Sequence, residues 1–553
     1  MDESAEQTKV EWREWGPDAF TEAQDEDKPV LLSLSATWCS WCHQMDREAY
    51  SNPMVAANVN DSFVPVRVDI DRQPRVRERY NMGGFPSNVF ATPEGELLTG
   101  ATYLETDGMR QIVERIRDLW THKGRDAARV PRSLREKPPE GEVTEEIERL
   151  VGGQLDEKYD ADFGGWGDSQ KFPMPRTIEF ALKRERQQAR STLAAIQNAL
   201  LDDYDGGFFR FAEGQDWSEV HHEKLLSTNA ALVRAFAEGY LYTGEEEYHD
   251  AARQTVEYLT TTLWNDERDA FAGSQAPGED YYERDPSDRE TTESPPVDQT
   301  VFADWNAMAV DALLTFSAYT DDERARNYAE RALDSLLDEL VEDGEVTHFE
   351  AVAESDEASE SGLLADHANL LAALTTAQQV LGGDRYLDVA ERVADHAIET
   401  LQLDGGAFVD GPDSGPGMLD RPMRPLDDNA EMAIALVDLA LLTGDEDYQT
   451  AAEDALAAFA GAADRFGVQV ANYATAAARV CQTPLTIEVA DDAGSDLHRA
   501  ALRMADHEKV VVPDATSEDD TIEDGSAYVV RDGERSSPAT TPDELSSLVA
   551  DGV

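Results

Sequence analysis

The chain has few cysteines and few positive charges, and each scarcity excludes a class of protein. Only Cys39, Cys42 and Cys481 occur in 553 residues, too few for the disulfide framework of a small secreted scaffold. Lys and Arg number 47 against 114 Asp and Glu, so the formal net charge is −67. Such a surface repels phosphates and anionic lipid headgroups, so we expect no nucleic acid partner and no membrane partner.

Long apolar runs are also missing. The chain has no stretch of about 18 uncharged apolar residues, so we predict no membrane span. The acidic start of the chain lacks the apolar core of a secretory signal. We therefore expect a cytoplasmic protein. Global disorder is rejected, because 41% of the residues are hydrophobic and they recur with helical spacing. The acidic excess instead indicates adaptation to very high salt, where counterions screen the repulsion.

The chain predicts several domains. Residues 1–125 alternate strand and helix, which predicts a mixed sheet flanked by helices. The expected strands are 30–35, 63–69, 88–91 and 97–99, and the expected helices are 40–59 (interrupted at Asn52-Pro53), 73–81 and 106–120. Residues 126–142, rich in charge and proline, suit a linker.

Residues 143–480 predict an all-helical domain. Apolar residues fall at i, i+3, i+4 and i+7 in eleven stretches, one of which runs over 176–202. One pattern recurs three times, at Gly244, Gly382 and Gly444. In each case a helix ends near the glycine, and acidic residues and a tyrosine follow. About six such hairpins favour a closed (α/α)6 toroid, with an irregular helical domain as the alternative. Residues 481–553 predict a small α/β appendage, with strands at 485–489 and 509–512 and a helix at 542–550.

The clearest chemical motif is Cys39-Ser40-Trp41-Cys42-His43, which follows a predicted strand and opens a helix. A thiol at a helix N-terminus feels the positive end of the helix dipole, which favours the nucleophilic thiolate. We assign Cys39 as the nucleophile and Cys42 as the resolving thiol, and expect His43 to lower the pKa of the neighbouring thiol. A c-type haem attachment, a zinc site and two merely buried cysteines are the alternatives. Haem attachment needs export and zinc needs a second cysteine pair, so we predict no cofactor and no metal site.

Several motifs together resemble the spermatogenesis-associated protein 20 family, which has many prokaryotic members. They are Cys39-Ser-Trp-Cys-His-Gln-Met, Gly83-Gly-Phe-Pro, Lys171-Phe-Pro, His222-Glu-Lys-Leu-Leu, Trp305-Asn306 and Gly405-Gly-Ala-Phe. The acidic composition indicates a member of haloarchaeal type. The resemblance implies a thioredoxin-like fold joined to an (α/α)6 toroid similar to N-acylglucosamine 2-epimerases and six-hairpin glycosidases. It also implies that Phe85-Pro86 is a cis bond facing the cysteines, which adds Pro86 to the catalytic set.

The sequence departs from its relatives at two places. Ordinary thioredoxins have a buried aspartate six residues before the first cysteine, where this chain has Ser33. Proton transfer to the resolving Cys42 therefore has no obvious base. The family often has a further cysteine pair near Tyr528, where this chain has Val529, Val530 and Ser536, so no second dithiol is available.

The helical domain offers a second candidate site. Toroids bind ligands where their loops converge, and a histidine beside a carboxylate suits acid–base chemistry. The predicted binding residues for a carbohydrate-like ligand are Trp166, His222, Glu223, Trp305, Asn306, Asp366 and Asn429. The loops that carry Trp166, His222, Trp305 and Asp366 are expected to form one pocket. Asp304, His367 and Glu431 offer further polar groups. For each, the alternative is a core aromatic or a solvated acid.

Two classes of function follow. The first is thiol–disulfide exchange on a protein disulfide or a small-molecule substrate, with the toroid recruiting that substrate. The second is a carbohydrate-active or sugar-binding toroid with a structural or regulatory thioredoxin-like module. A non-enzymatic scaffold is a third reading. The dithiol motif favours the first, because it is more specific than scattered carboxylates.

Overall fold

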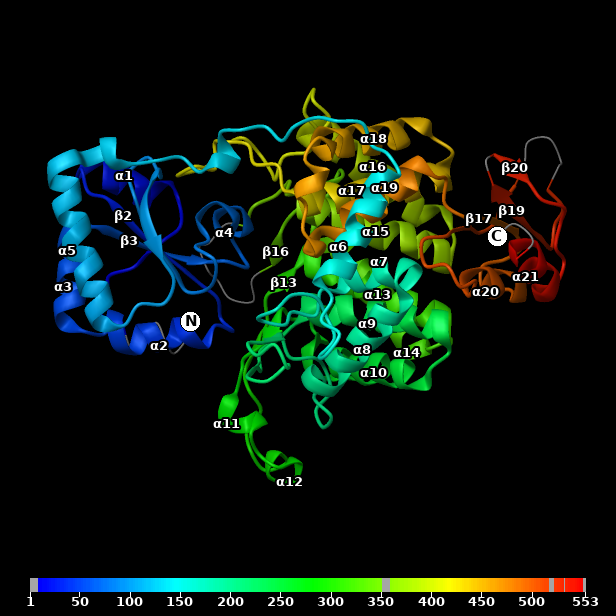
Figure 1. Cartoon of the computed structure of the whole chain (residues 1–553), viewed down its shortest axis with the longest axis horizontal. Helices are drawn as coiled ribbons and strands as arrows, with labels where there is room; N and C mark the ends of the chain where they lie inside the picture. Colours follow the sequence, from blue (N-terminus) through cyan, green and yellow to red (C-terminus); the bar gives the residue numbers. More distant parts are fainter. Residues whose placement is uncertain (1–7, 351–358, 517–521, 532, 551–553) are drawn as a thin grey trace. The chain divides into compact units, whose positions relative to one another are not determined.

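The computed structural model describes residues 8–350, 359–516, 522–531 and 533–550 (Figure 1). They form two compact units. The first contains the described residues up to Lys137 together with 359–360 and 410–423, and the second contains the others. Arg129 exchanges two backbone hydrogen bonds with Leu97, of 2.9 and 3.0 Å, which ties part of the expected linker to the first unit.

The first unit is built on a five-stranded sheet of order β1-β3-β2-β4-β5. Its strands are β1 (Arg13–Glu14), β2 (Val30–Ser35), β3 (Val64–Asp69), β4 (Ser87–Ala91) and β5 (Leu97–Ala101). The three strands β1, β3 and β2 are parallel, and β4 and β5 continue the sheet antiparallel. The four predicted strands are confirmed, whereas the two-residue β1 was not predicted.

The helices of this unit also follow the sequence pattern. They are α1 (Pro17–Asp25), α2 (Ser40–Met45), α3 (Pro53–Ser62), α4 (Pro74–Tyr80) and α5 (Thr106–Lys123), with a π-helical turn at Asp46–Tyr50. The predicted interruption at Asn52-Pro53 is confirmed. The Asn52 side chain accepts hydrogen bonds from the first backbone N–H groups of α3, and Pro53 occupies its first position.

A segment from the second half of the sequence completes the first unit. Residues 410–423 lie against α4, where Arg75 and Arg79 are both buried. Asp410 forms ion pairs with both guanidinium groups. Arg75 also donates to the carbonyl of Leu419 at 2.9 Å, and Arg79 to that of Met418 at 3.0 Å. These contacts, absent from any local sequence pattern, make the segment part of the thioredoxin-like unit.

The second unit is a closed ring of helices. In chain order, inner helices α7, α9, α13, α15, α17 and α19 pack each against the next, and α19 packs against α7. The outer helices α6, α8, α10, α14, α16 and α18 pack against them. The bounds are α6 (Glu146–Lys158), α7 (Pro175–Arg184), α8 (Arg186–Leu200), α9 (Leu226–Thr243), α10 (Glu246–Tyr258), α13 (Ala303–Thr320), α14 (Glu323–Glu339), α15 (Leu364–Leu381), α16 (Asp384–Leu401), α17 (Leu426–Thr443), α18 (Glu446–Ala460) and α19 (Ala471–Cys481). The predicted (α/α)6 toroid is confirmed.

One predicted helix is divided in two. The stretch 176–202 forms inner helix α7 and outer helix α8, separated at Glu185, whose backbone leaves the helical region. Neither proline nor glycine marks this break, so local sequence carried no signal for it. The ring requires it, because inner and outer helices alternate along the chain.

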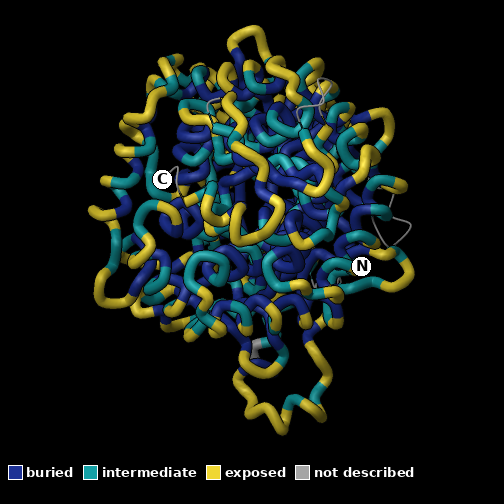
Figure 2. Tube along the Cα trace, turned by 90° about the vertical axis from the view of Figure 1, so that its right-hand side faces the viewer, coloured by how far each residue is buried: buried dark blue, intermediate teal, exposed yellow. Residues whose placement is uncertain are grey.

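Short strands and turns connect the helices at the end of the ring where most inner helices begin. The strands are β6 (Phe211–Ala212), β7 (Val220–His221), β8 (Lys224–Leu225), β9 (Trp264–Asn265), β10 (Ala270–Phe271), β11 (Ser274–Gln275), β12 (Val297–Asp298), β13 (Val301–Phe302), β14 (Val341–Glu342), β15 (Glu345–Val346) and β16 (Phe349–Glu350). Short helices α11 (Glu279–Tyr282) and α12 (Pro286–Arg289) lie on a projecting, largely exposed loop (Figures 1 and 2).

The C-terminal region is the expected small α/β appendage. Its sheet has the order β18-β17-β19-β20. The elements are β17 (Thr486–Ala490), α20 (Asp496–Leu502), β18 (Val510–Val512), β19 (Ser526–Arg531), β20 (Glu534–Arg535) and α21 (Pro542–Ala550). The acidic stretch 514–525 lies partly outside the described residues. None of the helices in the described part of the chain combines the length and apolar composition needed to cross a bilayer.

The paired charges in the first unit generate a stability prediction. Asp410→Ala should leave Arg75 and Arg79 buried without their carboxylate and lower the free energy of unfolding by about 3–5 kcal/mol. The measurement is native-state hydrogen exchange of amides in β2–β4. Glu136→Ala, which removes an exposed ion pair with Arg132, is the control and should cost under about 1 kcal/mol. Equal effects of the two substitutions would contradict the assignment.

Candidate functional site

The dithiol of the first unit lies at the junction of β2 and α2. Cys39 and Cys42 form a disulfide with Cα atoms 5.2 Å apart. Cys39 is the N-cap residue of α2, and its Sγ accepts a hydrogen bond from the Cys42 backbone N–H at 3.2 Å. The same N–H and the helix dipole would stabilise a thiolate at Cys39 after reduction. The assignment of Cys39 as nucleophile and Cys42 as resolving thiol stays a prediction.

Aromatic residues surround the disulfide. Cys39 is only 4% exposed, and the neighbouring Trp38 is also buried. The Trp38 indole N–H donates to Asp71 at 2.6 Å, and its ring lies edge-on to Phe85, 6.4 Å away. Trp41 is the exposed member, at 43%.

The peptide bond between Phe85 and Pro86 is cis, as the family resemblance implied. Pro86 is buried immediately before β4, which pairs with β2. His43 lies in the first turns of α2 and is partly buried, and its backbone N–H donates to the Cys39 carbonyl at 3.2 Å. The predicted redox residues thus come from the same small group of elements.

A neutral hydrogen-bond network occupies the place where thioredoxins bury an acid. Ser33 is buried on β2, and the Tyr50 hydroxyl donates to the side chain of Asn88. Burial raises the pKa of Tyr50 well above its usual value, so this network stays uncharged. A buried acid, Asp46, follows α2 four residues after Cys42 in the chain, and it pairs with Arg67 at 2.5 Å. Asp46 is the acid that our sequence reasoning missed.

In the second unit, two predicted ligand residues are core aromatics. Trp166 is 4% exposed, and its indole N–H donates to Gln188 at 3.2 Å. Trp305 is 9% exposed and packs against Phe302, with ring centroids 4.9 Å apart. Both placements favour the structural alternative over sugar stacking.

Asn306 and Asn429 also have structural roles. The Asn306 amide bonds both the N–H and the carbonyl of Phe271, at 2.8 and 3.0 Å. Asn429 does the same to Phe408, at 2.7 and 3.0 Å, and Asn229 repeats the arrangement with Phe208. Each asparagine is the fourth residue of an inner helix and fully buried. The repeat ties the glycine-rich or aromatic loop to the next helix, which explains these residues without a ligand.

The sequence His222-Glu223-Lys224 is similarly built into the loops. The His222 ring lies 4.8 Å from the ring of Phe209. Glu223 is buried and pairs with Arg210 at 3.1 Å. Lys224 is buried and donates to Asp202 at 2.8 Å and to the Gly206 carbonyl at 2.7 Å. The lysine, to which the sequence analysis assigned no role, thus fixes the glycine-rich loop.

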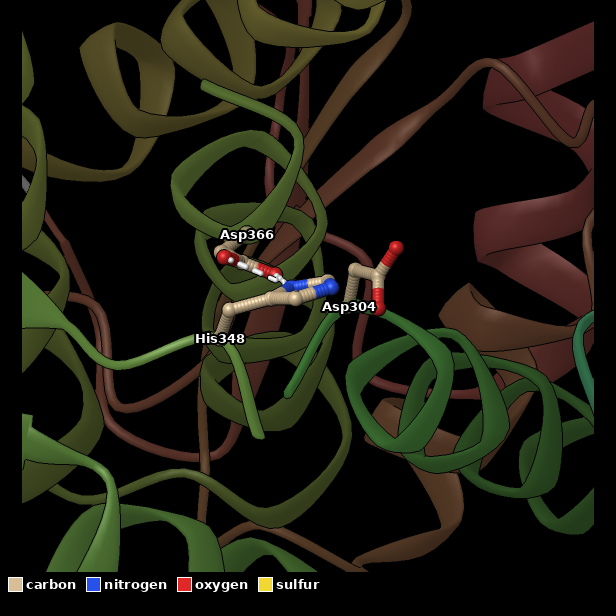
Figure 3. Close-up of side chains that lie close together, drawn as sticks. All are labelled: Asp304, His348 and Asp366. Carbon is tan, nitrogen blue, oxygen red and sulfur yellow. Dashed lines mark hydrogen bonds and ion pairs between the residues drawn. The ribbon is translucent and has the colours of Figure 1, made fainter. Parts of the chain in front are cut away.

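Asp366 is the predicted toroid residue with a chemically suggestive environment. It is fully buried in the first turn of α15, and both its oxygens contact Nδ1 of His348, at 2.9 and 3.1 Å. Asp304, in the first turn of α13, lies on the other side of the imidazole (Figure 3). One nitrogen of His348 and one oxygen of each aspartate lie within 4.8 Å of one another. His348 was not a sequence candidate, because it is remote from both aspartates in the chain.

The interior of the ring is charged rather than apolar. Arg234 on α9 pairs with Glu238 and Asp311, and Arg176 on α7 pairs with Glu179 and Glu431. The cavities among these side chains have volumes of about 80 and 50 Å³. Ligand pockets are typically about 300–1,000 Å³, so these cavities do not accommodate a sugar ring. Their lining does not include Trp166, His222, Trp305 or Asp366.

The C-terminal region contacts the charged side chains inside the ring. Glu508 pairs with Arg184 of α7 at 2.5 Å, and its backbone carbonyl accepts from Arg479 of α19 at 2.7 Å. His507 lies 3.9 Å from Glu238. The appendage therefore forms part of the wall of the helical unit instead of standing apart from it.

These features define the class of protein to which the first unit belongs: a thioredoxin-like domain with a Cys-x-x-Cys disulfide at a helix start. Residues 3–137 match the family described as "Thioredox_DsbH: Protein of unknown function, DUF255". The chain is also 31% identical over 109 residues to thiol:disulfide interchange protein DsbD 1 of Pseudomonas aeruginosa, covering 19% of this chain and 18% of that protein.

The relative that extends further is spermatogenesis-associated protein 20. The human protein is 30% identical over 295 residues, covering 46% of this chain. This confirms the resemblance expected from the motifs. The aligned part spans 37% of the human protein's length. A solved cellobiose 2-epimerase from Bacillus thermoamylovorans matches 56% of this chain and 85% of its own, at 14% identity and a TM-score of 0.46.

The charged interior generates a prediction on pH. Burial and the nearby Glu179 raise the pKa of Glu238 to about 8. The folded state therefore holds this proton more tightly than the unfolded state, and the resulting stability is lost as pH rises from about 4.5 to about 8. Glu238→Gln should remove this loss, on the order of a few kcal/mol.

The measurement is urea unfolding of both proteins at pH 4.5, 6.5 and 8. His507, 3.9 Å from Glu238, has a pKa that burial lowers to about 3, and it changes stability in the opposite direction. Exposed Glu247→Gln is the control and should keep the wild-type pH dependence. Parallel stability curves for wild type and Glu238→Gln would refute the assignment.

Proposed function

We propose that the chain is a thiol–disulfide oxidoreductase whose reacting groups are Cys39 and Cys42. The observation that carries the proposal is the disulfide at the start of α2, with Cys39 Sγ bonded to the Cys42 N–H. The name of the DsbD relative, a thiol:disulfide interchange protein, supports the same chemistry. The substrate class is a disulfide in a protein or a small molecule.

The exchange proceeds in two displacements. In the reduced protein, the Cys39 thiolate attacks one sulfur of the substrate disulfide, and the other substrate sulfur leaves as a thiolate. Cys42 then loses its proton and attacks Cys39 Sγ, which releases the second substrate thiolate and forms the Cys39–Cys42 disulfide. Two electrons pass to the substrate, and protons from the two cysteines balance its two thiols. The reverse sequence oxidises a dithiol partner.

The residues around the disulfide assist in separate ways. The N-terminal backbone of α2 stabilises negative charge on Cys39 in the first step and on the same sulfur when it leaves. The hydrogen bond from Trp38 to Asp71 fixes the aromatic wall beside it. Ser33 supplies no acid to take the Cys42 proton, so we expect resolution to be slower than the first attack. Asp46 is already paired with Arg67.

The test is a trapping experiment in a Cys481→Ser background, which leaves only the two reacting thiols. Reduced Cys42→Ser protein mixed with a model protein disulfide should accumulate a mixed disulfide at Cys39, because the resolving thiol is missing. Cys39→Ser protein should trap at least about tenfold less, since Cys42 lies further into the helix. The products are identified by intact mass and peptide mapping under acid quench.

A matched control removes the exposed aromatic neighbour without touching sulfur. Trp41→Ala in the Cys42→Ser background should still trap at Cys39. If trapping falls equally on both cysteines, or occurs on neither in the folded protein, the assigned roles are wrong.

A further inference from the structure

We propose that Asp304, His348 and Asp366 form a binding site for a first-row divalent metal ion in the toroid. These residues offer one nitrogen and two carboxylate oxygens within 4.8 Å of one another. They come from three separate places in the second unit: the start of α13, the residue before β16 and the start of α15 (Figure 3). This site is independent of the dithiol chemistry.

The backbone holds the three residues in place before any ion binds. The carbonyl of His348 accepts a hydrogen bond from the N–H of Ala303 at 2.8 Å. The next residues pair with β13, so Phe349 lies opposite Phe302. Asp304 follows directly in α13, and its carboxylate accepts from the Trp305 N–H at 2.8 Å. Ligands on regular elements with such support are suited to a preorganised site.

Charge and burial distinguish this cluster from ordinary acids at helix starts. A carboxylate in the first turn of a helix commonly stabilises the helix and faces water. Asp366 instead is fully buried and His348 is 2% exposed. The two carboxylates bring negative charge to this group, and buried charges in proteins are paired or coordinate metals. Asp366 pairs with His348 at 2.9 Å, and a divalent cation bound by all three residues would neutralise both carboxylates.

The donor types select the kind of metal. Magnesium and calcium prefer all-oxygen sites, whereas an imidazole combined with carboxylates suits zinc, manganese or iron. His348 Nδ1 and Asp366 are hydrogen-bonded at 2.9 and 3.1 Å, a separation that two ligands each about 2.1 Å from one ion would have at an angle of about 90°. Three protein ligands also leave coordination positions for water or for an oxygen-containing ligand.

The experiment titrates the oxidised full-length protein with Co²⁺ as a spectroscopic probe and then displaces it with Zn²⁺. The Cys39–Cys42 disulfide keeps the dithiol from binding metal, and excess Mg²⁺ and KCl occupy the many surface carboxylates. We expect one equivalent of Co²⁺ with a visible absorption of nitrogen and oxygen ligation and no sulfur charge-transfer band. Asp304→Asn, His348→Asn and Asp366→Asn should each weaken binding by at least tenfold.

The matched control is His249→Asn. His249 also lies near two carboxylates, 3.5 Å from Asp250 and 4.0 Å from Glu246, but on the outer helix α10. It should bind Co²⁺ as the wild type does. Asp304 is partly exposed, so Asp304→Asn should remain folded by circular dichroism even if the buried substitutions do not. Binding that is equal in wild type and Asp304→Asn, or no stoichiometric binding at all, would overturn the proposal.

Discussion

The pairing of buried charge is the constraint on which the loops of this protein depend. Lys171 is 1% exposed and donates to Asp160 at 2.9 Å and to the carbonyls of Gly164 and Gly167. Although burial opposes it, the contact with Lys171 helps to lower the pKa of Asp160 to about 2. Lys224 and Asp202 repeat this arrangement one hairpin later. Removing one member of such a pair leaves an uncompensated buried charge, which commonly costs about 3–5 kcal/mol.

The same principle holds in both units and explains much of the sequence. In the first unit, Asp410 satisfies two arginines of α4 and joins a distant segment to the thioredoxin-like fold. In the second unit, charged side chains of the inner helices point into the ring and form ion pairs there. The motifs Lys171-Phe-Pro and His222-Glu-Lys therefore have a structural explanation. Among the described residues, the dithiol at Cys39 and the cluster at His348 are places where the side chains suit chemistry.

The sequence predicted those parts of the fold that depend on local periodicity. The strands of the first unit, the helix start at Cys39 and the toroid follow from apolar spacing, glycine positions and the family motifs. The break between α7 and α8 was not predictable, because it arises from ring closure and no local residue marks it. The role of Asn306 was also hidden, since its partner Phe271 lies 35 residues away.

Candidate sites were predictable to the extent that their residues are adjacent in the chain. Cys39, Cys42 and His43 lie within five residues, and the structure places them together at one helix start. The toroid residues named from the sequence include two members, Asp304 and Asp366, of the cluster that the fold assembles. His348 joins it through the pairing of β13 with β16, a contact between segments that carry no shared motif.

The most direct test of the account is an equilibrium redox titration of the wild-type chain in glutathione buffers. Alkylation and intact mass should show a single two-electron transition, in which Cys39 and Cys42 change together while Cys481 is unaffected. If Cys39 and Cys42 change from dithiol to disulfide over a defined range of glutathione redox potential, the disulfide is reversible. If the pair stays oxidised at every poise, or no intramolecular disulfide forms at any, the cysteines are structural and the oxidoreductase proposal fails.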